Sequence, residues 1–487
     1  MPDRFSNGDP TNDNLPGLQP ANRSDPRAYH GGDFRGIQNR LDYLKDLGIT
    51  GIWMTPVYQN SSHSALPAHG YDAVDFYAVE PHFGTMRDLQ QLVEASHEHG
   101  IKVMLDQVPN HCGPAHPWVE APPTKTWFHD LDVTPHVPNN DIAALTDPYA
   151  RPRRRVLPLR AWFNGRLPDL DQTDPFVRDY LIQNALWWIG ETGADGFRID
   201  TFTRVDRSFW QECNSAIKRQ FPYFFTLGEA SGLRTPAMMS LFQGGATHFG
   251  SDTKVDLILD FQLYRVIRSV FAQNVSMSEL AEVLSQDFTY PHPEVLVPFL
   301  GNHDVPRFLS LPGSDMSRLQ LAEAFLLTTR GIPHLYYGDE VGMGLGSNGD
   351  HTADRADFPG GFPGDAVDAF RPEGRRGEAA LAFDFLRKVL HFRQAHLALQ
   401  GGSLLQLLVE DNRYAYLRSS GNDQVLVVLD RSGASRPVEI ETDDLGIPDG
   451  ARFRFLEGRK NDVVVSQGKL IITAPEIINI LWRVSTN

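Results

Sequence analysis

Cysteine and long apolar runs are scarce in this chain of 487 residues. The two cysteines, Cys112 and Cys213, have no CxxC spacing, which excludes a disulfide framework and a thiolate metal site. No run of about 18 apolar residues occurs, so we expect a soluble protein with no membrane-spanning segment. The opening MPDRFSNGDP lacks the features of a signal peptide. We expect a cytoplasmic protein, or a periplasmic or extracellular one whose leader has been removed.

Positive charge is also in short supply. The sequence has 45 Lys and Arg against 61 Asp and Glu, a formal charge of -16. Such a balance repels phosphate backbones, so nucleic acid and membrane surfaces are not expected partners. The one basic run, residues 151–155, is interpreted as a solvated loop in preference to a phosphate-binding patch. Nothing in the composition indicates the oligomeric state.

Between residues 34 and 340, short apolar runs alternate with segments of helical period. This pattern is typical of parallel strands joined by helices and predicts a (β/α)8 barrel. Helices are expected near residues 37–44, 89–93 and 176–189, with Gly48 and Gly100 ending the first two. The predicted strands are 51–57, 101–108, 196–200, 224–229, 297–304 and 334–339.

The alternation of predicted strands and helices is interrupted once and then ends. Residues 113–170 are rich in Pro, Asn and Asp, which predicts an inserted B domain after the third strand. Residues 396–487 alternate in short runs, which predicts a C-terminal antiparallel β-sandwich. The catalytic barrel would then comprise 1–112 and 171–395. Its first strand is expected to be truncated or replaced by an unusual closure, because the chain opens where that strand should be ending.

Polar residues follow the predicted strands at the ends that meet in the mouth of such a barrel. Any single aspartate there could equally be a helix cap. Several carboxylates in one mouth are costly unless function requires them, because like charges disfavour ionisation. The residues selected in this way are Asp106, Asn110, His111, Arg198, Asp200, Glu229, His303 and Asp304.

Cleavage of a glycosidic bond needs this combination of groups. One carboxylic acid protonates the leaving oxygen while a second, ionised carboxylate attacks the anomeric carbon. Asp200 suits attack, because Arg198 two residues earlier points to the same side and should hold it ionised. Glu229 follows an apolar run, and flanking carboxylates should raise its pKa into the range useful to an acid.

Several segments resemble the α-amylase superfamily, glycoside hydrolase family 13, in order and spacing. The resemblance extends from about residue 3 to residue 390 and is closest to the neopullulanase, cyclomaltodextrinase and maltodextrin-degrading α-amylase branch. Four segments look like the diagnostic regions and two like secondary motifs: DQVPNH (106–111), GFRID (196–200), LGEA (227–230) and GNHD (301–304), with LPDLDQ (167–172) and GIPHLYYGDEVGM (331–343).

The resemblance implies roles for individual residues. Asp200 would be the nucleophile, Glu229 the general acid/base, and Asp304 the carboxylate that grips sugar hydroxyls and stabilises the oxocarbenium-like state. Asp106 would support these groups without reacting. HGYDAVDFY (69–77) resembles the segment that stacks on the sugar, and the loop 350–355 resembles one that binds the next sugar, where Asp350 is the weaker candidate. The implied sugar-binding residues are His69, Tyr71, His111, Arg198, His303 and Arg355.

Oxygen donors are concentrated near the N-terminus. Calcium takes six to eight oxygen ligands in flexible loops, although a surface loop rich in Asx turns would read similarly. The segment resembles the N-terminal calcium loop of cyclodextrin glycosyltransferases and neopullulanases, which implies one Ca²⁺ site. Arg204 stands where many family members have a histidine, so a second, interdomain calcium is not expected. The candidate ligands are Asn7, Asp9, Asn12, Asp13, Gly31 and Asp33.

The predicted function is retaining hydrolysis of α-1,4-glucosidic bonds, with α-1,6 bonds left open, in starch, maltodextrins or cyclodextrins. The expected partners are therefore α-glucan oligosaccharides or polysaccharides. Two alternatives stay open: an α-glucan transglycosylase that uses the same covalent intermediate, and a non-catalytic carbohydrate-binding relative. The third reading is the weakest, because such relatives usually lose a catalytic carboxylate and this chain keeps all three.

Overall fold

The chain forms two compact units. The computed structural model describes residues 1–61, 67–132, 136, 139–344, 354–433, 436–458, 461–473 and 475–484. The first unit comprises Met1–Phe261, Thr289–His292 and Asn348–Gly377. The second comprises Gln262–Phe288, Pro293–Ser347 and Glu378–Asn487. The domain boundaries at residues 113, 171 and 396 stay predictions.

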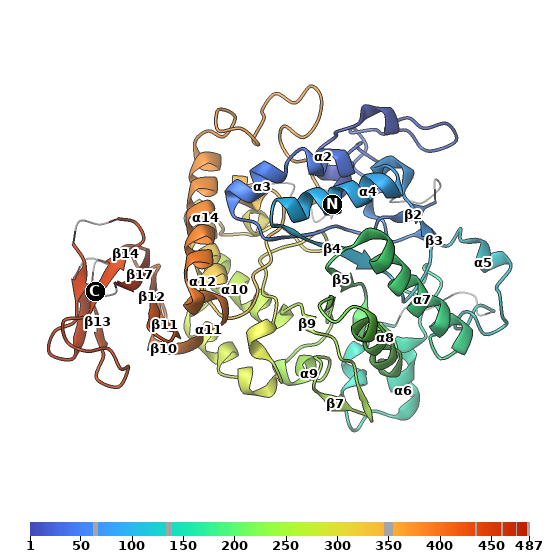
Figure 1. Cartoon of the computed structure of the whole chain (residues 1–487). Coiled ribbons are helices and arrows are strands. Elements are labelled where there is room, and N and C mark those ends of the chain that lie inside the picture. Colours follow the sequence, from blue (N-terminus) through green and yellow to red (C-terminus); the bar gives the residue numbers. More distant parts are fainter. Residues whose placement is uncertain are drawn as a thin grey trace. The chain divides into compact units, whose positions relative to one another are not determined.

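The first unit is built around a parallel sheet with the strand order β1-β4-β5-β6-β9 (Figure 1). All four neighbouring pairs are parallel, so the carboxyl ends of the strands lie along one edge. Four predicted strands are thereby confirmed, each somewhat shorter than expected. The strands are β1 (Gly51–Trp53), β4 (Lys102–Gln107), β5 (Gly196–Ile199), β6 (Phe225–Gly228) and β9 (Leu257–Ile258).

Helices of this unit begin and end at the signals visible in the sequence. Thr85 and Asp88 form a capping box at the start of α4, and Gly48 ends α3 in the left-handed region at φ 100°. The run predicted at 37–44 is two helices, because the chain leaves the helix at Asn39. The helices are α1 (Pro2–Phe5), α2 (Phe34–Gln38), α3 (Leu41–Leu47), α4 (Met86–Glu98), α5 (Pro117–Glu120), α6 (Pro152–Val156), α7 (Pro175–Thr192), α8 (Arg207–Gln220) and α9 (Pro236–Ser240).

Two short hairpins of the first unit were not predicted. β2 (Tyr58–Asn60) pairs with β3 (Ala73–Val79), and β7 (Thr247–His248) pairs with β8 (Ser251–Asp252). In the predicted insertion 113–170, the described residues form α5, α6 and 3-10 turns. The basic run 151–155 was interpreted as a loop, but most of it lies in helix α6. Residues 2–5, where a truncated first strand was expected to be ending, form helix α1.

The second unit contains helices and the C-terminal antiparallel sheets. One sheet has the order β10-β11-β12-β17-β14-β15, and β13 pairs with β16. The predicted C-terminal β region is thereby confirmed. The elements are α10 (Phe261–Gln273), α11 (Ser278–Leu284), α12 (Met316–Thr328), α14 (Glu378–Ala395), α15 (Leu397–Gly401), β10 (Ser403–Val409), β11 (Arg413–Ser420), β12 (Asp423–Asp430), β13 (Val438–Glu441), β14 (Arg452–Phe455), β15 (Val463–Val464), β16 (Lys469–Ile472) and β17 (Ile478–Val484).

The strands predicted at 297–304 and 334–339 are not continuous strands. A single parallel bridge joins Phe299 to His334, and Asp339–Val341 is a 3-10 helix. Both runs contain or follow proline, at Pro298 and Pro333, and proline lacks the N–H that a ladder of hydrogen bonds needs. The prediction of their extent was wrong, although the bridge keeps the two segments parallel.

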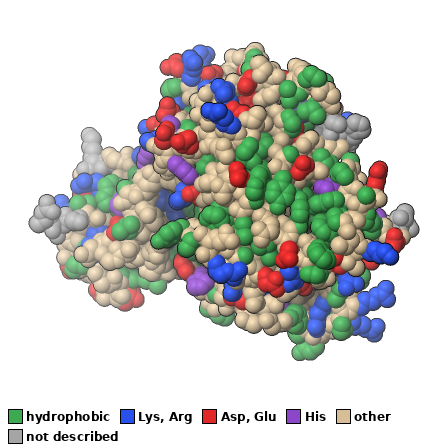
Figure 2. Space-filling model, turned by 45° about the vertical axis from the view of Figure 1, so that its right-hand side comes forward, with side chains coloured by type: hydrophobic (Ala, Val, Ile, Leu, Met, Phe, Trp, Pro, Cys, Tyr) green, Lys and Arg blue, Asp and Glu red, His purple; other side chains and the backbone are tan. Residues whose placement is uncertain are grey.

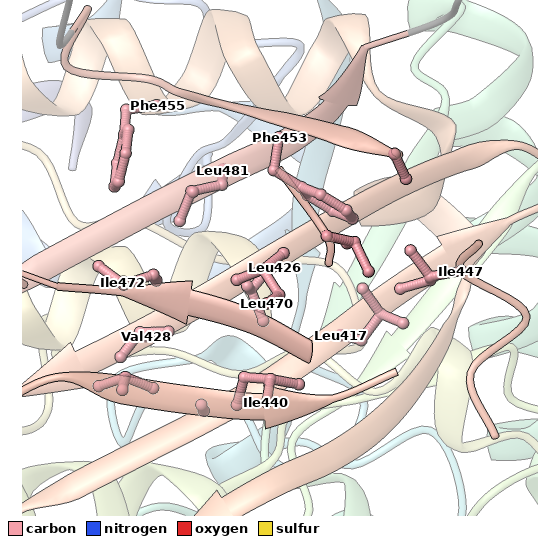
Figure 3. Packing of buried hydrophobic residues seen from close by; sticks show 14 residues of the cluster. Leu417, Leu426, Val428, Ile440, Ile447, Phe453, Phe455, Leu470, Ile472 and Leu481 are labelled. Atoms are coloured by element: carbon pink, nitrogen blue, oxygen red, sulfur yellow. The ribbon is translucent and has the colours of Figure 1, made fainter. Parts of the chain in front are cut away.

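A cluster of fourteen buried residues forms the core between the C-terminal strands (Figure 3). Residues on β13, β14 and β16 alternate between buried and exposed, as expected where one face of a sheet packs on a core. On β16, Leu470 points into the cluster with 1% of its surface exposed, while its neighbour Ile471 is 43% exposed. The period of two in the sequence therefore places the core of this region.

The visible surface carries charge of both signs. Figure 2 shows Lys and Arg side chains interspersed with Asp, Glu and apolar side chains on the face in view. In the part of the chain that the structure describes, no helix is both long and apolar enough to cross a bilayer.

The pair on β16 offers a test of the core. We expect Leu470→Ala to lower the free energy of unfolding by about 2 to 5 kcal/mol, because it opens a cavity in a packed cluster. Ile471→Ala on the same strand removes little buried area and should cost much less. Urea unfolding of both variants, followed by intrinsic fluorescence, checks this. Equal losses in the two variants would contradict the assignment of the buried face.

Candidate active site

The guanidinium of Arg198 lies at the centre of a cluster of carboxylates. Arg198 is fully buried on β5, between β4 and β6. Its Nη1 donates to Oδ1 of Asp200 at 2.9 Å and to both oxygens of Asp106 at 3.0 and 2.9 Å. Its Nη2 donates to Oε2 of Glu229 at 2.7 Å. Three strand ends thus meet at one cation, as their shared edge predicts.

Burial and neighbouring charges act in opposite directions on the pKa values of the groups in this cluster. Burial alone would lower the pKa of Arg198, but Asp106, Glu229 and Asp200 hold it well above its ordinary value. Burial raises the pKa of Asp106 to about 6, against the opposing effect of Arg198. The guanidinium therefore stays charged, and it compensates the carboxylates that surround it.

Two aromatic side chains complete the shell of Asp106. Trp53 Nε1 at the end of β1 donates to Oδ2 of Asp106 at 3.1 Å, and the hydroxyl of Tyr71 donates to the same oxygen at 2.9 Å. The Arg198 guanidinium lies 5.0 Å from the Trp53 ring and 5.7 Å from the Tyr71 ring, within cation–π range. Asp106 thus accepts four hydrogen bonds from three donor groups, which fits the supporting role implied for it.

Glu229 is fixed from the backbone as well. It follows β6, and its Oε2 accepts a hydrogen bond from the amide of Thr201 at 3.0 Å. Thr201 comes directly after Asp200 and adopts the left-handed conformation, with φ 46° and ψ 34°. A β-branched residue rarely adopts this conformation. The strained turn directs the backbone amide that follows Asp200 toward Glu229.

Three of the implied sugar-binding residues of the first unit, His69, Tyr71 and His111, lie near this cluster. His69 stacks on Tyr71 with ring centroids 5.4 Å apart, and its Nδ1 accepts from the Tyr71 amide at 2.9 Å. His111 stacks on Phe163 at 5.7 Å. Burial lowers the pKa of His111 to about 4, although Asp72 opposes the shift, so the ring is neutral at physiological pH. A neutral imidazole can both donate to and accept from sugar hydroxyls.

Contacts from the inserted segment were not foreseen from the sequence. Arg166 forms a bidentate pair with the buried Asp72 at 3.1 and 3.2 Å, next to Tyr71. Arg204, four residues after Asp200, donates to the Asn139 carbonyl at 2.9 Å and to Oδ1 of Asn140 at 2.5 Å. The charged residues were visible in the sequence, but no local pattern indicates partners that are about 65 to 95 positions away.

Three other predicted residues are described, and two of them belong to the second unit. His303 and Asp304 belong to the second unit, where Nε2 of His303 lies 3.1 Å from Oδ2 of Asp304. The roles of both stay predictions. Arg355 accepts from Arg4 through its backbone carbonyl at 3.2 Å, and its sugar-binding role also stays a prediction. Asp350 lies outside the described residues.

The predicted calcium ligands fall into two groups. Nδ2 of Asn7 donates to both oxygens of Asp13 at 3.0 Å, and a Cβ on Gly31 would lie 2.4 Å from Oδ1 of Asp13. Asn12 lies on the same loop and is buried. By contrast, Asp33 accepts three backbone N–H groups, from Gly8, Asp9 and Gly36, and Asp9 accepts from Thr11. Their carboxylates therefore hold the loop itself in shape.

Among the described residues, no group of three or more His, Cys, Asp and Glu side chains is arranged to hold a metal ion.

Asn110, next to His111, was also selected from the sequence, and its Nδ2 lies 3.2 Å from Nδ1 of His111. Three carboxylates on one buried cation, beside aromatic rings and a neutral imidazole, form a site suited to acid and nucleophile chemistry on a neutral polyol.

The chain matches a family of known proteins over most of its length. The catalytic domain of α-amylase matches residues 1–359. A β/α-amylase of Paenibacillus polymyxa is 34% identical over 506 residues, which cover 99% of this chain and 37% of that protein. A cyclomaltodextrinase of Geobacillus thermopakistaniensis is 31% identical over 92% of this chain and 70% of its own length. The chain thus spans little more than a third of the first relative.

Solved structures of similar proteins share the fold along the whole chain. An Anoxybacillus α-amylase has a TM-score of 0.81 at 30% identity, covering 100% of this chain and 97% of that one. A Geobacillus thermoleovorans α-amylase complexed with acarbose has a TM-score of 0.80 at 30% identity, with the same coverage. The chain belongs to the α-amylase family, glycoside hydrolase family 13. It is a glycoside hydrolase with the predicted barrel and C-terminal sheet domain.

The central cation offers a test that does not depend on activity. We expect Arg198→Met to lower the free energy of unfolding by about 3 to 5 kcal/mol, because it leaves buried carboxylates without their partner. Adding Asp106→Asn should restore part of the loss. Arg154→Met breaks an exposed pair with Asp141 and should leave stability unchanged. Urea unfolding of the variants measures these changes. An equally small change in the free energy of unfolding for both arginine substitutions would contradict the description of the cluster.

Proposed function

We propose that the chain hydrolyses α-1,4-glucosidic bonds of starch, maltodextrins or cyclodextrins with retention of the anomeric configuration. Asp200 attacks the anomeric carbon, and Glu229 protonates the leaving oxygen and then activates water. The observation that carries the proposal is the sharing of Arg198 by these two carboxyl groups. Bonds to one guanidinium keep them near each other, which suits the separation of about 5 to 5.5 Å used by retaining enzymes.

The surrounding residues support these roles. Arg198 keeps a positive charge beside Asp200, which favours the ionised, nucleophilic form of an aspartate. Tyr71 and His69 form a stacked pair beside the cluster, and aromatic faces of this kind pack against sugar rings. His111 can bond sugar hydroxyls without adding charge. The role of Asp304 as third carboxylate rests on the sequence alone.

Transfer to a sugar acceptor is a second candidate. A cyclomaltodextrin glucanotransferase with a three-domain ABC distribution has a TM-score of 0.81 at 28% identity, over 100% of this chain and 98% of that chain. A hydroxyl of an acceptor sugar can intercept the same covalent intermediate in place of water. Maltoheptaose incubations separate the candidates, because transfer gives products longer than the substrate.

The catalytic assignment predicts the outcome of two substitutions. Asp200→Asn and Glu229→Gln should each lower kcat on maltoheptaose by at least about 10⁴-fold, since each removes a group that acts in bond cleavage. Glu191→Gln, on the exposed end of α7, is the control and should retain full activity. Product NMR should show the α-anomer first. Unchanged turnover in either active-site variant, or initial β-anomer, would refute the assignment.

We propose further that the N-terminal loop holds one calcium ion. Two oxygens, Oδ1 of Asn7 and Oδ1 of Asn12, are buried without a hydrogen-bond partner among the described residues, as expected of atoms reserved for a cation. The carboxylate of Asp13 lies beside Asn7, and Gly31 closes the loop where a side chain would clash. These donors are oxygen atoms of the kind that Ca²⁺ prefers.

Calcium removal should therefore destabilise the protein. At a free concentration 100 times Kd, a bound ion contributes about 2.7 kcal/mol, so excess EDTA should lower Tm by several degrees, and Ca²⁺ should restore it. In Asp13→Ala, Tm should no longer depend on Ca²⁺. Asp25→Ala, on an exposed turn nearby, should keep the full calcium response. A wild-type Tm that EDTA leaves unchanged would rule out the site.

A further inference from the structure

Residues 168–171 of the LPDLDQ segment lie between two other pieces of backbone. On one side, Asp169 forms an antiparallel bridge with His111, the amide of Cys112 donates to the Pro168 carbonyl at 3.1 Å, and the amide of Leu170 donates to the Asn110 carbonyl at 2.9 Å. On the other side, the amide of His129 donates to the Asp169 carbonyl at 2.9 Å. Residues 168–170 are therefore hydrogen-bonded on one side to the backbone at residues 110–112, which includes His111, and on the other side to the backbone of His129.

His129 is bonded to two carboxylates of this segment. Its Nδ1 lies 2.7 Å from Oδ2 of Asp169, and its Nε2 lies 3.0 Å from Oδ1 of Asp171. His129 is 8% exposed and Asp169 is 1% exposed. An imidazole with an acceptor at each nitrogen can satisfy both only when both nitrogens carry hydrogen. The geometry therefore calls for the protonated ring.

The charges that face this histidine come from two elements. Asp169 and Asp171 lie on the segment itself, and Arg204 on the turn after β5 also acts on Asp169. Burial alone would lower the pKa of His129, but its hydrogen bonds to Asp169 and Asp171 raise it to about 9. The pKa exceeds the ordinary value of about 6.5. Burial also raises the pKa of Asp169 to about 7, against the opposing bond to His129. The ion pair is thus complete between about pH 7 and pH 9: Asp169 takes up a proton below this range, and His129 loses one above it.

We infer that His129 is a positioning residue, whose bridge to Asp169 and Asp171 holds the backbone of residues 168–170, and through it His111, in the arrangement that binds sugar. The inference rests on the proposed hydrolysis of α-glucans, in which His111 contacts the substrate. His129 touches no reacting atom. Without the bridge, a buried carboxylate loses its counter-charge, and the segment behind His111 loses a fixed hydrogen-bond partner.

The first experiment measures the coupling without any substrate. In wild-type protein labelled with ¹³C-histidine, the ring Cε1 resonance of His111 is identified by its disappearance in His111→Asn. Since His111 itself stays neutral above about pH 4 and Asp169, with a pKa of about 7, is largely ionised above about pH 8, the His111 resonance should shift between about pH 8 and 10 by responding to His129, with an apparent pKa of about 9. In His129→Gln this step should vanish. A His111 resonance that does not move in wild type overturns the inference.

The second experiment uses kinetics on maltoheptaose at pH 7. His129→Gln should raise KM roughly tenfold while kcat changes less than about threefold, and adding it to His111→Asn should raise KM no further, since residues that act through one another are not additive. His97→Gln is the matched control, because His97 also bonds a carboxylate, Asp195, but at the opposite ends of the strands. It should leave KM unchanged. If the KM increases of the two single variants multiply in the double variant, the inference is overturned. If the wild-type protein does not cleave maltoheptaose, the proposed function is refuted, and the NMR titration alone tests the role of His129.

Discussion

A single buried guanidinium holds the charge balance on which the site depends. Arg198 contacts carboxylates at the carboxyl ends of three different strands, so its position fixes Asp106, Asp200 and Glu229 relative to one another. Burying one charge without a partner is expensive, and burying several of the same sign is more so. The parallel sheet holds the cation next to the carboxylates and so offsets their charge, because the register places residue 198 beside residues 106 and 227 on the neighbouring strands. The register of the parallel strands thus sets the distances between the charged groups at the strand ends.

The inserted segment is attached to the sheet by a different kind of contact. It has short helices and turns, and polar links join it to the rest of the first unit: Arg166 to Asp72, and Arg204 to Asn139 and Asn140. Such links are directional and specific, and they act beside apolar packing, in which Trp118 and Trp127 of the segment contact Tyr180 on α7. Each polar link ends beside a residue that the family resemblance assigns to sugar binding or catalysis.

The sequence could predict those parts of the molecule that repeat or that follow a periodic element. Asp200 and Glu229 were located because they follow apolar strands, and Leu470 was buried where a period of two required it. The apolar pattern predicted two strands that are longer than the bridge that the structure forms there, because it takes no account of the prolines at 298 and 333, which lack the N–H that strand pairing needs. The partners of His129 and Arg204 could not be foreseen, because pairing between distant irregular segments leaves no periodic trace. The same holds for the Asp9 and Asp33 carboxylates, whose acceptance of backbone amides depends on local turns.

Thr201 carries a consequence for how this sequence can vary. A threonine in the left-handed conformation costs roughly 1 to 2 kcal/mol relative to the usual backbone, and the turn recovers it by placing the residue 201 amide on Glu229. Glycine and asparagine would adopt the same turn with less strain. The turn therefore accommodates glycine or asparagine at position 201 with less backbone strain than threonine, whereas valine and isoleucine, which are also β-branched, would keep the strain.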